Sequence, residues 1–267
     1  MLRSLFTGIS GLRAHQQMLD VTSNNIANVN TAGYKTASTV FGDTLSQTIS
    51  GAGAPAGANG GTNPMQVGLG VKLAGTSTNF SQGSSQYTGR TSDLLINGDG
   101  FFVMNDGGQQ TFTRAGSFSL DSAGHLVSPD GAIVQSAAGG DLDLSALSSG
   151  AYKSWSVTSS GVVNGVDAVG TTTALGAIAM ATFANPGGLT KVGDSQYQSS
   201  ANSGAAQIGG ANTGGRGSLT PGYLEMSNVD LAAELTNLII SQRGFQANSR
   251  VITTSDEVLQ SLISLKN

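Results

Sequence analysis

Cysteine is absent from the 267 residues, so the chain can form no disulfide and no thiolate site. Charge is scarce too: Asp, Glu, Lys and Arg make up 10% of the chain, against about 25% in an average soluble domain. The 12 Lys and Arg do not form the basic field of a nucleic-acid-binding protein. No apolar run approaches the roughly 18 residues of a membrane span, and residues 1–9 are a poor match to a cleavable signal peptide. We therefore expect no nucleic-acid partner and no membrane span.

Residues for catalysis or metal binding are also few. The two histidines, His15 and His125, lie in different segments, and no third ligand stands at a useful spacing from either. Asp141 and Asp143 lack the further oxygen ligands of a calcium loop. Neither a phosphate-binding loop nor a nucleophile elbow is present. We therefore expect no catalytic residue, no metal, no cofactor and no enzymatic activity.

The C-terminal segment carries a heptad pattern, which predicts a long amphipathic helix in coiled-coil packing. Between residues 223 and 267 there is no proline and only one glycine. Ser227 is the expected cap, with Asp230 three residues further on to complete a box-like pair. The apolar residues that recur every seven positions are Leu231, Leu238, Phe245, Ile252 and Leu259.

A shorter heptad at the N-terminus predicts a second helix. Its residues are Leu5, Leu12, Leu19 and Ile26. The Asn- and Thr-rich run at residues 22–31 should end this helix, and Gly33 can supply a left-handed cap. The simplest way to cover both stripes is to pair the two ends. Two arrangements satisfy that: a helical hairpin packed on a globular core, or a protruding pair whose outer surfaces pack on other subunits.

The middle of the chain differs from its ends. Residues 34–70 are rich in Gly, Ala, Ser and Thr, which predicts a linker or extended region. Residues 71–222 contain short strand-like runs separated by frequent turn signals, which predict an antiparallel β-domain. The expected fold is α+β: paired coiled-coil helices at residues 1–33 and 223–267, with an antiparallel all-β domain inserted between them.

Three blocks of sequence carry a family resemblance. The first comprises GISGL at 8–12, NNIAN at 24–28 and TAGYK at 31–35. The second comprises DLLINGDGFF at 93–102, TRAGSF at 113–118 and GHLV at 124–127, and the third comprises GYLEMSNVDL at 222–231 and QRGFQ at 242–246. In this order the blocks resemble the axial proteins of the bacterial flagellum, which are its rod, hook and hook-associated proteins.

The resemblance implies an architecture and a set of partners. Both chain ends would form an inner coiled-coil layer of a helical tube, and the β-domain would form an outer layer. The chain would be a homopolymer outside the cell, exported by the flagellar type III apparatus without a cleaved signal. The distal rod protein, the hook cap and the hook–filament junction protein would be its neighbours. Phe41 and Leu45 resemble an export motif, although they could equally be an i, i+4 packing pair.

Within the family the sequence favours a short hook protein, the subunit of a flexible universal joint. Residues 61–71 and the final residues 262–267 carry that likeness. The distal rod protein, a rigid drive shaft, is the alternative, because the chain also has its length. A secreted β-domain adhesin is a remote alternative, which would leave the two terminal heptads unexplained.

Overall fold

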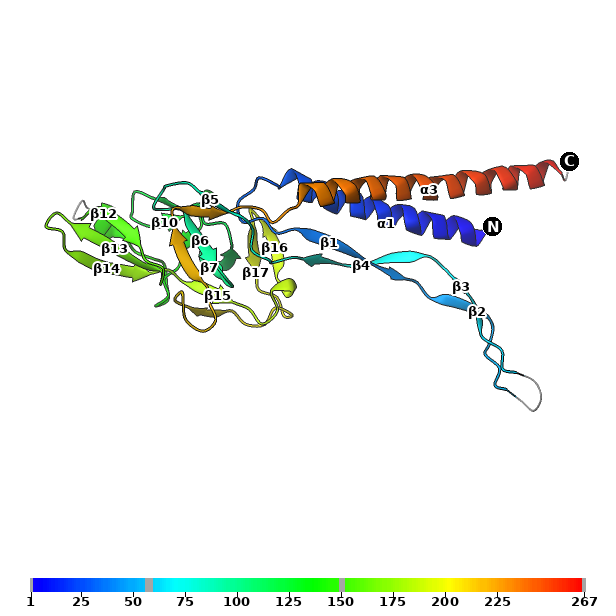
Figure 1. Ribbon diagram of the computed structural model, residues 1–267, viewed down its shortest axis with the longest axis horizontal. Helices are drawn as coiled ribbons and strands as arrows, with labels where there is room; N and C mark the ends of the chain where they lie inside the picture. Colours follow the sequence, from blue (N-terminus) through cyan, green and yellow to red (C-terminus); the bar gives the residue numbers. More distant parts are fainter. Residues whose placement is uncertain (1, 56–59, 149–151, 266–267) are drawn as a thin grey trace. The chain divides into compact units, whose positions relative to one another are not determined.

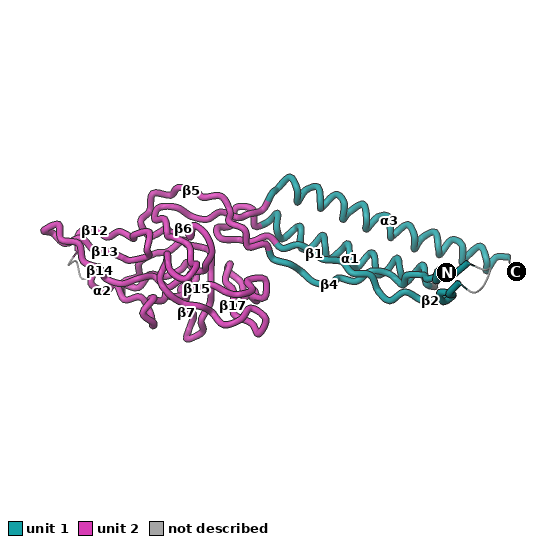
Figure 2. Tube along the Cα trace, turned by 60° about the horizontal axis from the view of Figure 1, so that its bottom comes forward, with its two compact units in different colours: residues 1–27, 37–78, 230–267 teal, residues 28–36, 79–229 magenta. Residues whose placement is uncertain are grey.

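A computed structural model describes residues 2–55, 60–148 and 152–265 of the chain. It forms two compact units, coloured separately in Figure 2. Unit 1 takes residues 1–27, 37–78 and 230–267, and unit 2 takes residues 28–36 and 79–229. The fold is α+β with an N-terminal helix, a C-terminal helix and a β-rich middle, as the sequence predicted. No helix in the described ranges is both long enough and apolar enough to cross a membrane.

Unit 1 contains the two long helices and two strand pairs (Figure 1). The helices are α1 (Leu2–Ala27) and α3 (Leu231–Ser264). The antiparallel strand pairs are β1 (Ala37–Asp43) with β4 (Val71–Thr78), and β2 (Ser46–Ser50) with β3 (Met65–Gly68).

Helix α3 begins later than the sequence predicted. Its N-cap is Asp230, whose carboxylate accepts hydrogen bonds from the backbone N–H groups of Ala232 and Ala233. The expected cap, Ser227, lies before the helix, and residues 223–225 form a strand instead. Asp230 is the stronger choice because its negative charge also faces the positive end of the helix dipole.

The prediction of a linker over residues 34–70 missed three strands. Strands β2 and β3 are exposed at every residue, so no alternation of apolar and polar side chains marks them. Their pairing rests on backbone hydrogen bonds, which the side-chain pattern does not reveal. Strand β1 alternates only between half-buried and exposed residues along most of its length, which is a similarly weak signal.

Unit 2 is built from short strands and one helical turn, α2 (Ser145–Ser148). Its strands are β5 (Ser85–Tyr87), β6 (Leu94–Asn97), β7 (Phe101–Asp106), β8 (Gln109–Thr113), β9 (Ser119–Leu120), β10 (Leu126–Val127), β11 (Ile133–Val134), β12 (Tyr152–Val157), β13 (Val162–Asp167), β14 (Thr172–Ala177), β15 (Met180–Thr182), β16 (Thr190–Gly193), β17 (Gln196–Gln198), β18 (Gln207–Gly209), β19 (Ser218–Pro221) and β20 (Tyr223–Glu225). A 3₁₀ turn, η1 (Pro186–Gly188), precedes β16.

Strand β7 is central to the largest sheet of the described residues, which has nine strands. The sheet runs β16-β17-β8-β7-β11-β10-β9, and β15 pairs with both β7 and β18. The β7–β8 hairpin turns through Gly107 and Gly108, whose φ values of 56° and 95° are the positive angles that a tight two-residue turn requires. A separate three-stranded sheet has the order β12-β13-β14, while β19 pairs with β6 and β20 pairs with β5.

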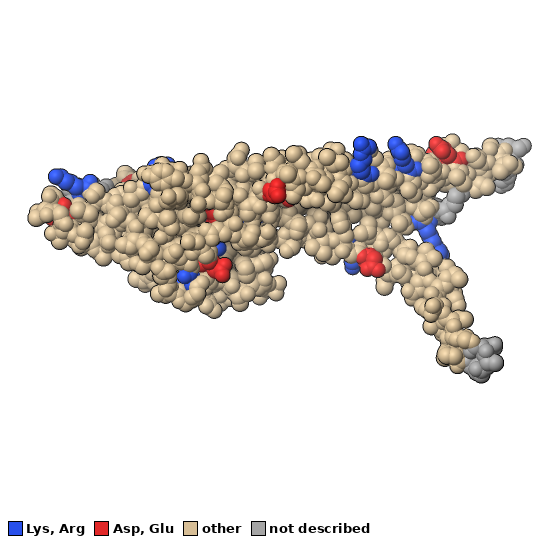
Figure 3. Space-filling model, in the orientation of Figure 1, with Lys and Arg blue, Asp and Glu red and all other residues tan. Residues whose placement is uncertain are grey.

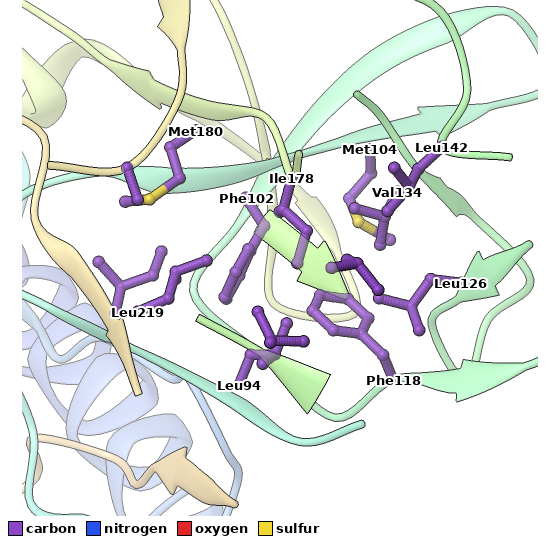
Figure 4. Packing of buried hydrophobic residues seen from close by; sticks show 14 of the residues in the cluster. Leu94, Phe102, Met104, Phe118, Leu126, Val134, Leu142, Ile178, Met180 and Leu219 are labelled. Atoms are coloured by element: carbon purple, nitrogen blue, oxygen red, sulfur yellow. The ribbon is translucent and has the colours of Figure 1, made fainter. Parts of the chain in front are cut away.

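The core of unit 2 lies on both faces of β7. Phe102 and Met104 point into one apolar cluster with Phe118, Leu126 and Ile178 (Figure 4). The alternate residues Phe101 and Val103 belong to a second cluster that includes Phe112 and Tyr197. Because successive side chains of a strand point to opposite faces, an unbroken apolar run such as 101–104 is what a strand buried on both sides needs.

Candidate assembly surfaces

The helices α1 and α3 lie side by side and run antiparallel (Figures 1 and 2). Glycines mark the line of closest approach. A Cβ atom built on Gly8 would lie 3.3 Å from Ile252 Cγ1, and one on Gly11 would lie 2.5 Å from Asn248 Oδ1. One on Gly244 would lie 2.4 Å from the ring of His15. The absence of side chains at these glycines therefore lets the two helices approach closely.

The seam of α3 is small and polar. Ser241 and Ser255 are buried and Asn248 is half-buried, at intervals of seven residues. Each side chain donates to the carbonyl four residues earlier in its own helix: Ser241 to Asn237 at 2.5 Å, Asn248 to Gly244 at 2.8 Å, and Ser255 to Val251 at 2.7 Å. These bonds satisfy the buried donors without a partner on α1, so the seam tolerates polar residues.

The predicted heptad residues flank this seam. Leu5, Leu12, Leu19 and Ile26 of α1 are half-buried, as are Leu238, Ile252 and Leu259 of α3. Leu231 and Phe245 are exposed, at 44% and 38% of their surface. The heptad prediction found both helices but not the glycines and serines at their line of contact. Coiled-coil geometry and a role of these residues in assembly stay predictions.

Helix α1 has a second neighbour in unit 1, the β1–β4 pair. The hydroxyl of Ser10 accepts a hydrogen bond from the N–H of Val71 at 3.3 Å. Asn25, which is 1% exposed, donates to the carbonyl of Ala37 at 2.8 Å and accepts from its N–H at 3.1 Å. The same amide donates to Glu234 Oε1 on α3 at 3.1 Å. Asn25 thus joins α1, β1 and α3; sequence reasoning assigned it only to the polar end of the helix.

A large apolar surface of α3 remains uncovered in unit 1. Charged side chains are sparse on the face that Figure 3 presents. The exposed apolar residues of α3 are Leu231, Leu235, Ile239, Ile240, Phe245, Val251, Val258, Leu262 and Ile263. On α1, Phe6 is 68% exposed. Exposed apolar side chains in this number on one helix are typical of a helix that contacts other molecules.

The candidate export residues lie in extended chain. Phe41 belongs to β1, with its ring centroid 6.2 Å from that of His15, and it is 38% exposed. Leu45 lies between β1 and β2 and is 86% exposed. The alternative of a helical i, i+4 packing pair is therefore wrong, because that contact needs a helix. The export role stays a prediction.

A cluster of buried charges lies in unit 2. Glu225 is 1% exposed and accepts from Lys35 Nζ at 2.5 Å, from the N–H of Gly83 at 2.9 Å and from Arg114 Nη1 at 3.3 Å. Both ion pairs found among the described residues converge on this carboxylate. Burial lowers the pKa of Lys35, while the hydrogen bond to Glu225 acts in the opposite direction. Sequence reasoning missed this cluster, although Lys35 and Glu225 both lie in the resemblance blocks.

The described residues contain no group of three or more His, Cys, Asp or Glu side chains that could hold a metal ion. His15 lies in unit 1 and His125 in unit 2, where its Nδ1 is 3.3 Å from the carbonyl oxygen of Leu142.

Three family profiles match the chain. "Flagella basal body rod protein" matches residues 5–35, "Flagellar hook protein FlgE/F/G D1 domain" matches residues 95–165, and "Flagellar basal body rod FlgEFG protein C-terminal" matches residues 220–265. These matches fall on α1, on the central part of unit 2 and on α3 with the segment before it.

Curated relatives match the whole chain. The chain is 48% identical over 267 residues to the flagellar basal-body rod protein FlgG of Bacillus subtilis, and the alignment covers 100% of both chains. It is 38% identical to the FlgG of Borreliella burgdorferi, covering 100% of this chain and 99% of that protein. The flagellar hook protein FlgE of the same organism is 29% identical, over a longer alignment of 442 positions that covers 100% of both chains.

The close approach at Gly244 predicts that a larger side chain there destabilises the helix pair, although it would stabilise an isolated helix. In an isolated helix, Gly244→Leu should stabilise by about 1 kcal/mol, because glycine is a poor helix former. Against the His15 ring the same change should destabilise the helix pair by about 1–3 kcal/mol through overpacking. Thermal unfolding followed by circular dichroism at 222 nm shows whether the substitution raises or lowers the melting temperature. The control is Ala247→Leu, an exposed position of the same helix. A Gly244→Leu variant that melts at or above the parent temperature would contradict the seam.

The charge cluster predicts that Glu225→Gln destabilises unit 2 by about 3–5 kcal/mol, since it leaves Lys35 and Arg114 buried without a counter-charge. Urea unfolding followed by the fluorescence of Trp155 reports on this unit, because Trp155 is the one tryptophan of the chain and packs against its core. Asp130→Asn, the same chemical change at an exposed residue, should stay within roughly 0.5 kcal/mol of the parent. Equal effects of the two changes would refute a stabilising ion cluster.

Proposed function

We propose, from the premise that this chain belongs to the flagellar basal-body rod and hook protein family, that it is a structural subunit of the flagellar rod. Many copies would assemble into a helical tube that transmits the torque of the motor. The rod is proposed in preference to the hook, which the sequence alone favoured.

One observation carries the preference for the rod. The chain and the Bacillus subtilis rod protein align over their full lengths at 48% identity. The hook protein of Borreliella burgdorferi reaches 29% identity, and only over an alignment much longer than this chain. The hook protein of Treponema pallidum is similar in both respects, at 27% identity over 462 positions. A hook subunit is therefore the second candidate, supported by identity over the whole chain but at a lower level.

The exposed apolar surface of α3 supports self-assembly. Ile239 and Ile240 are 56% and 53% exposed, so covering the rest of each side chain gains about 1–1.5 kcal/mol, which is roughly half of the value for a fully exposed side chain. Further copies of the same chain are the proposed cover. A contact between different patches of identical subunits produces a helical tube when its repetition does not close into a ring. In the tube the α1–α3 pair would line the interior as a coiled-coil layer.

The remaining assignments follow from the same premise. The protein would act by assembly rather than by catalysis, in the basal body and outside the inner membrane. It would reach that place through the flagellar export apparatus, with Phe41 and Leu45 as the candidate motif. Contacts with the hook cap and the hook–filament junction protein stay predictions that belong to the hook candidate.

Electron microscopy of the assembly that contains this protein tests the proposal. A short, straight cylinder of constant subunit repeat, labelled by an antibody to this chain, is the expected result. A curved, bendable tube carrying the label would replace the rod with the hook. Label confined to discrete particles without a polymer would refute both candidates.

The exposed apolar residues of α3 predict that a substitution among them impairs assembly without impairing the fold of the monomer. Ile239→Asp should raise the critical concentration for polymerisation by at least about tenfold, because one apolar side chain is no longer buried between copies. Circular dichroism of the monomer should stay unchanged in this variant, since Ile239 is exposed in the monomer. Leu238→Asp, at a half-buried position, should change both the critical concentration and the circular dichroism of the monomer. Gln242→Asp introduces the same charge at an exposed polar position and is the control. Sedimentation of the polymer measures all three, and normal assembly of Ile239→Asp would exclude this face.

A further inference from the structure

Unit 2 contains a pocket with a volume of about 260 Å³. This volume lies below the range of about 300–1,000 Å³ that is typical of small-molecule and cofactor sites. The pocket is therefore of a size to receive one large side chain. Every residue that lines it belongs to unit 2, and those that carry the argument are Phe80, Asp99, Phe101, Arg114, Thr182 and Phe183.

Three phenylalanine rings form the apolar wall of the pocket. The ring centroid of Phe101 lies 5.5 Å from that of Phe80 and 5.8 Å from that of Phe183, with interplanar angles of 76° and 70°. Edge-to-face contact of this kind is the arrangement that aromatic rings prefer. Phe80 and Phe183 are only half-buried, so each has surface left for a further ring. The pocket therefore favours an aromatic occupant.

Tyr87, at the end of β5, is the only exposed aromatic side chain in the described part of unit 2, at 70% of its surface. Its ring centroid lies 5.1 Å from that of Tyr223, the residue opposite it in the β5–β20 pair. A ring that already rests against a neighbour loses little conformational freedom on binding. Tyr87 thus has the properties of a residue that anchors an interface.

An exposed charge accompanies each of these two features. Arg90 lies three residues after Tyr87, and Asp99 lies at the pocket. Neither is in an ion pair, since the two ion pairs of the described residues both involve Glu225. Opposite charges on two surfaces direct their association and fix the register of the contact. The surface around Tyr87 is therefore complementary to the pocket in charge as well as in shape.

The two features lie on different parts of unit 2. Figures 1 and 2 both show β5 along the upper side of this unit and β15, whose Thr182 lines the pocket, below it. A contact between them joins two copies of the chain through different surfaces. The second copy then keeps its own Tyr87 available for a third, so the contact can be repeated along a polymer.

We infer that Tyr87 of one copy inserts into the aromatic pocket of the next copy, with Arg90 paired to Asp99 at the rim. The inference rests on the proposed function, to which it adds a specific contact between β-rich units. Val169, in the turn between β13 and β14, is even more exposed, at 86%. It is not the occupant, because valine has no ring to make edge-to-face contacts with the wall.

Removal of the ring tests the anchor. Tyr87→Ala should raise the critical concentration for polymerisation by at least about tenfold, as truncation of an interface anchor does. Val169→Ala removes another exposed side chain of unit 2 and is the matched control, with an expected change below about twofold. Urea unfolding followed by Trp155 fluorescence should be the same in both variants. Equal effects of the two substitutions on polymerisation would overturn the inference.

A charge exchange tests the register without altering Tyr87. Arg90→Glu and Asp99→Arg should each raise the critical concentration by about threefold, as the loss of an exposed ion pair and the new repulsion imply. The double variant should return to within about twofold of the parent, because it restores the opposite charges. Both positions are exposed, so neither change should affect the fold of the monomer. A double variant that polymerises no better than the single variants excludes this pairing.

The absence of native cysteine allows a direct test of which segments meet. A chain with Arg90→Cys and Asp99→Cys, polymerised above its critical concentration and treated with a short bismaleimide, should give a ladder of covalent multimers on a denaturing gel. Arg90→Cys with Asp130→Cys, an exposed position outside the pocket, is the matched control and should give no ladder. Absence of the first ladder, or an equal ladder from both chains, overturns the contact.

The pocket contact and the rod assignment fail separately, because crosslinking tests the first and the shape of the polymer tests the second. A ladder from a curved, bendable tube supports the contact and refutes the rod. A straight cylinder that gives no ladder supports the rod and refutes the contact. A parent chain that forms no polymer, together with a cysteine pair that forms no ladder, refutes both.

Discussion

The buried carboxylate of Glu225 is the interaction on which the organisation of this chain depends. It lies three residues before Asn228 and draws together Lys35, Gly83 and Arg114, which come from segments far apart in the sequence. An ion removed from water is tolerated only where its partners are close and its hydrogen bonds are complete. A buried cluster of this kind therefore specifies one arrangement of its segments and penalises the others.

The two units place their apolar residues in opposite ways. Unit 2 packs aromatic and aliphatic side chains on both faces of β7, so its core is complete within one chain. Unit 1 brings its helices together at Gly8, Gly11 and Gly244, and leaves Ile239 and Leu262 exposed. A subunit of a helical assembly needs one unit whose core is complete within the chain and a second unit whose apolar residues are free to contact further copies.

Much of the fold could be predicted because it follows from local pattern. The heptads located α1 and α3, and the short strand-like runs with their turn signals located the β-rich middle of the chain. Strands β2 and β3 could not be found, since every residue in them is exposed and their pairing is a backbone property. The preference for the hook over the rod relied on short likenesses at 61–71 and 262–267, and full-length identity to rod proteins outweighs them.

The sequence by itself determined the class of protein. The three ordered blocks resemble flagellar axial proteins, and the missing cysteine, scarce charge and two terminal heptads agree with that resemblance, because all of these features are local in the sequence. Only the tertiary structure decided what the polar residues of those blocks do. The sequence placed Asn25 at the polar end of the N-terminal helix and Lys35 in the linker region. It placed Glu225 and Asn228 in the C-terminal helix. Each of the four binds a segment distant in sequence. A hydrogen bond between residues 190 positions apart leaves no periodic trace, so no pattern in the sequence could reveal the bond between Lys35 and Glu225.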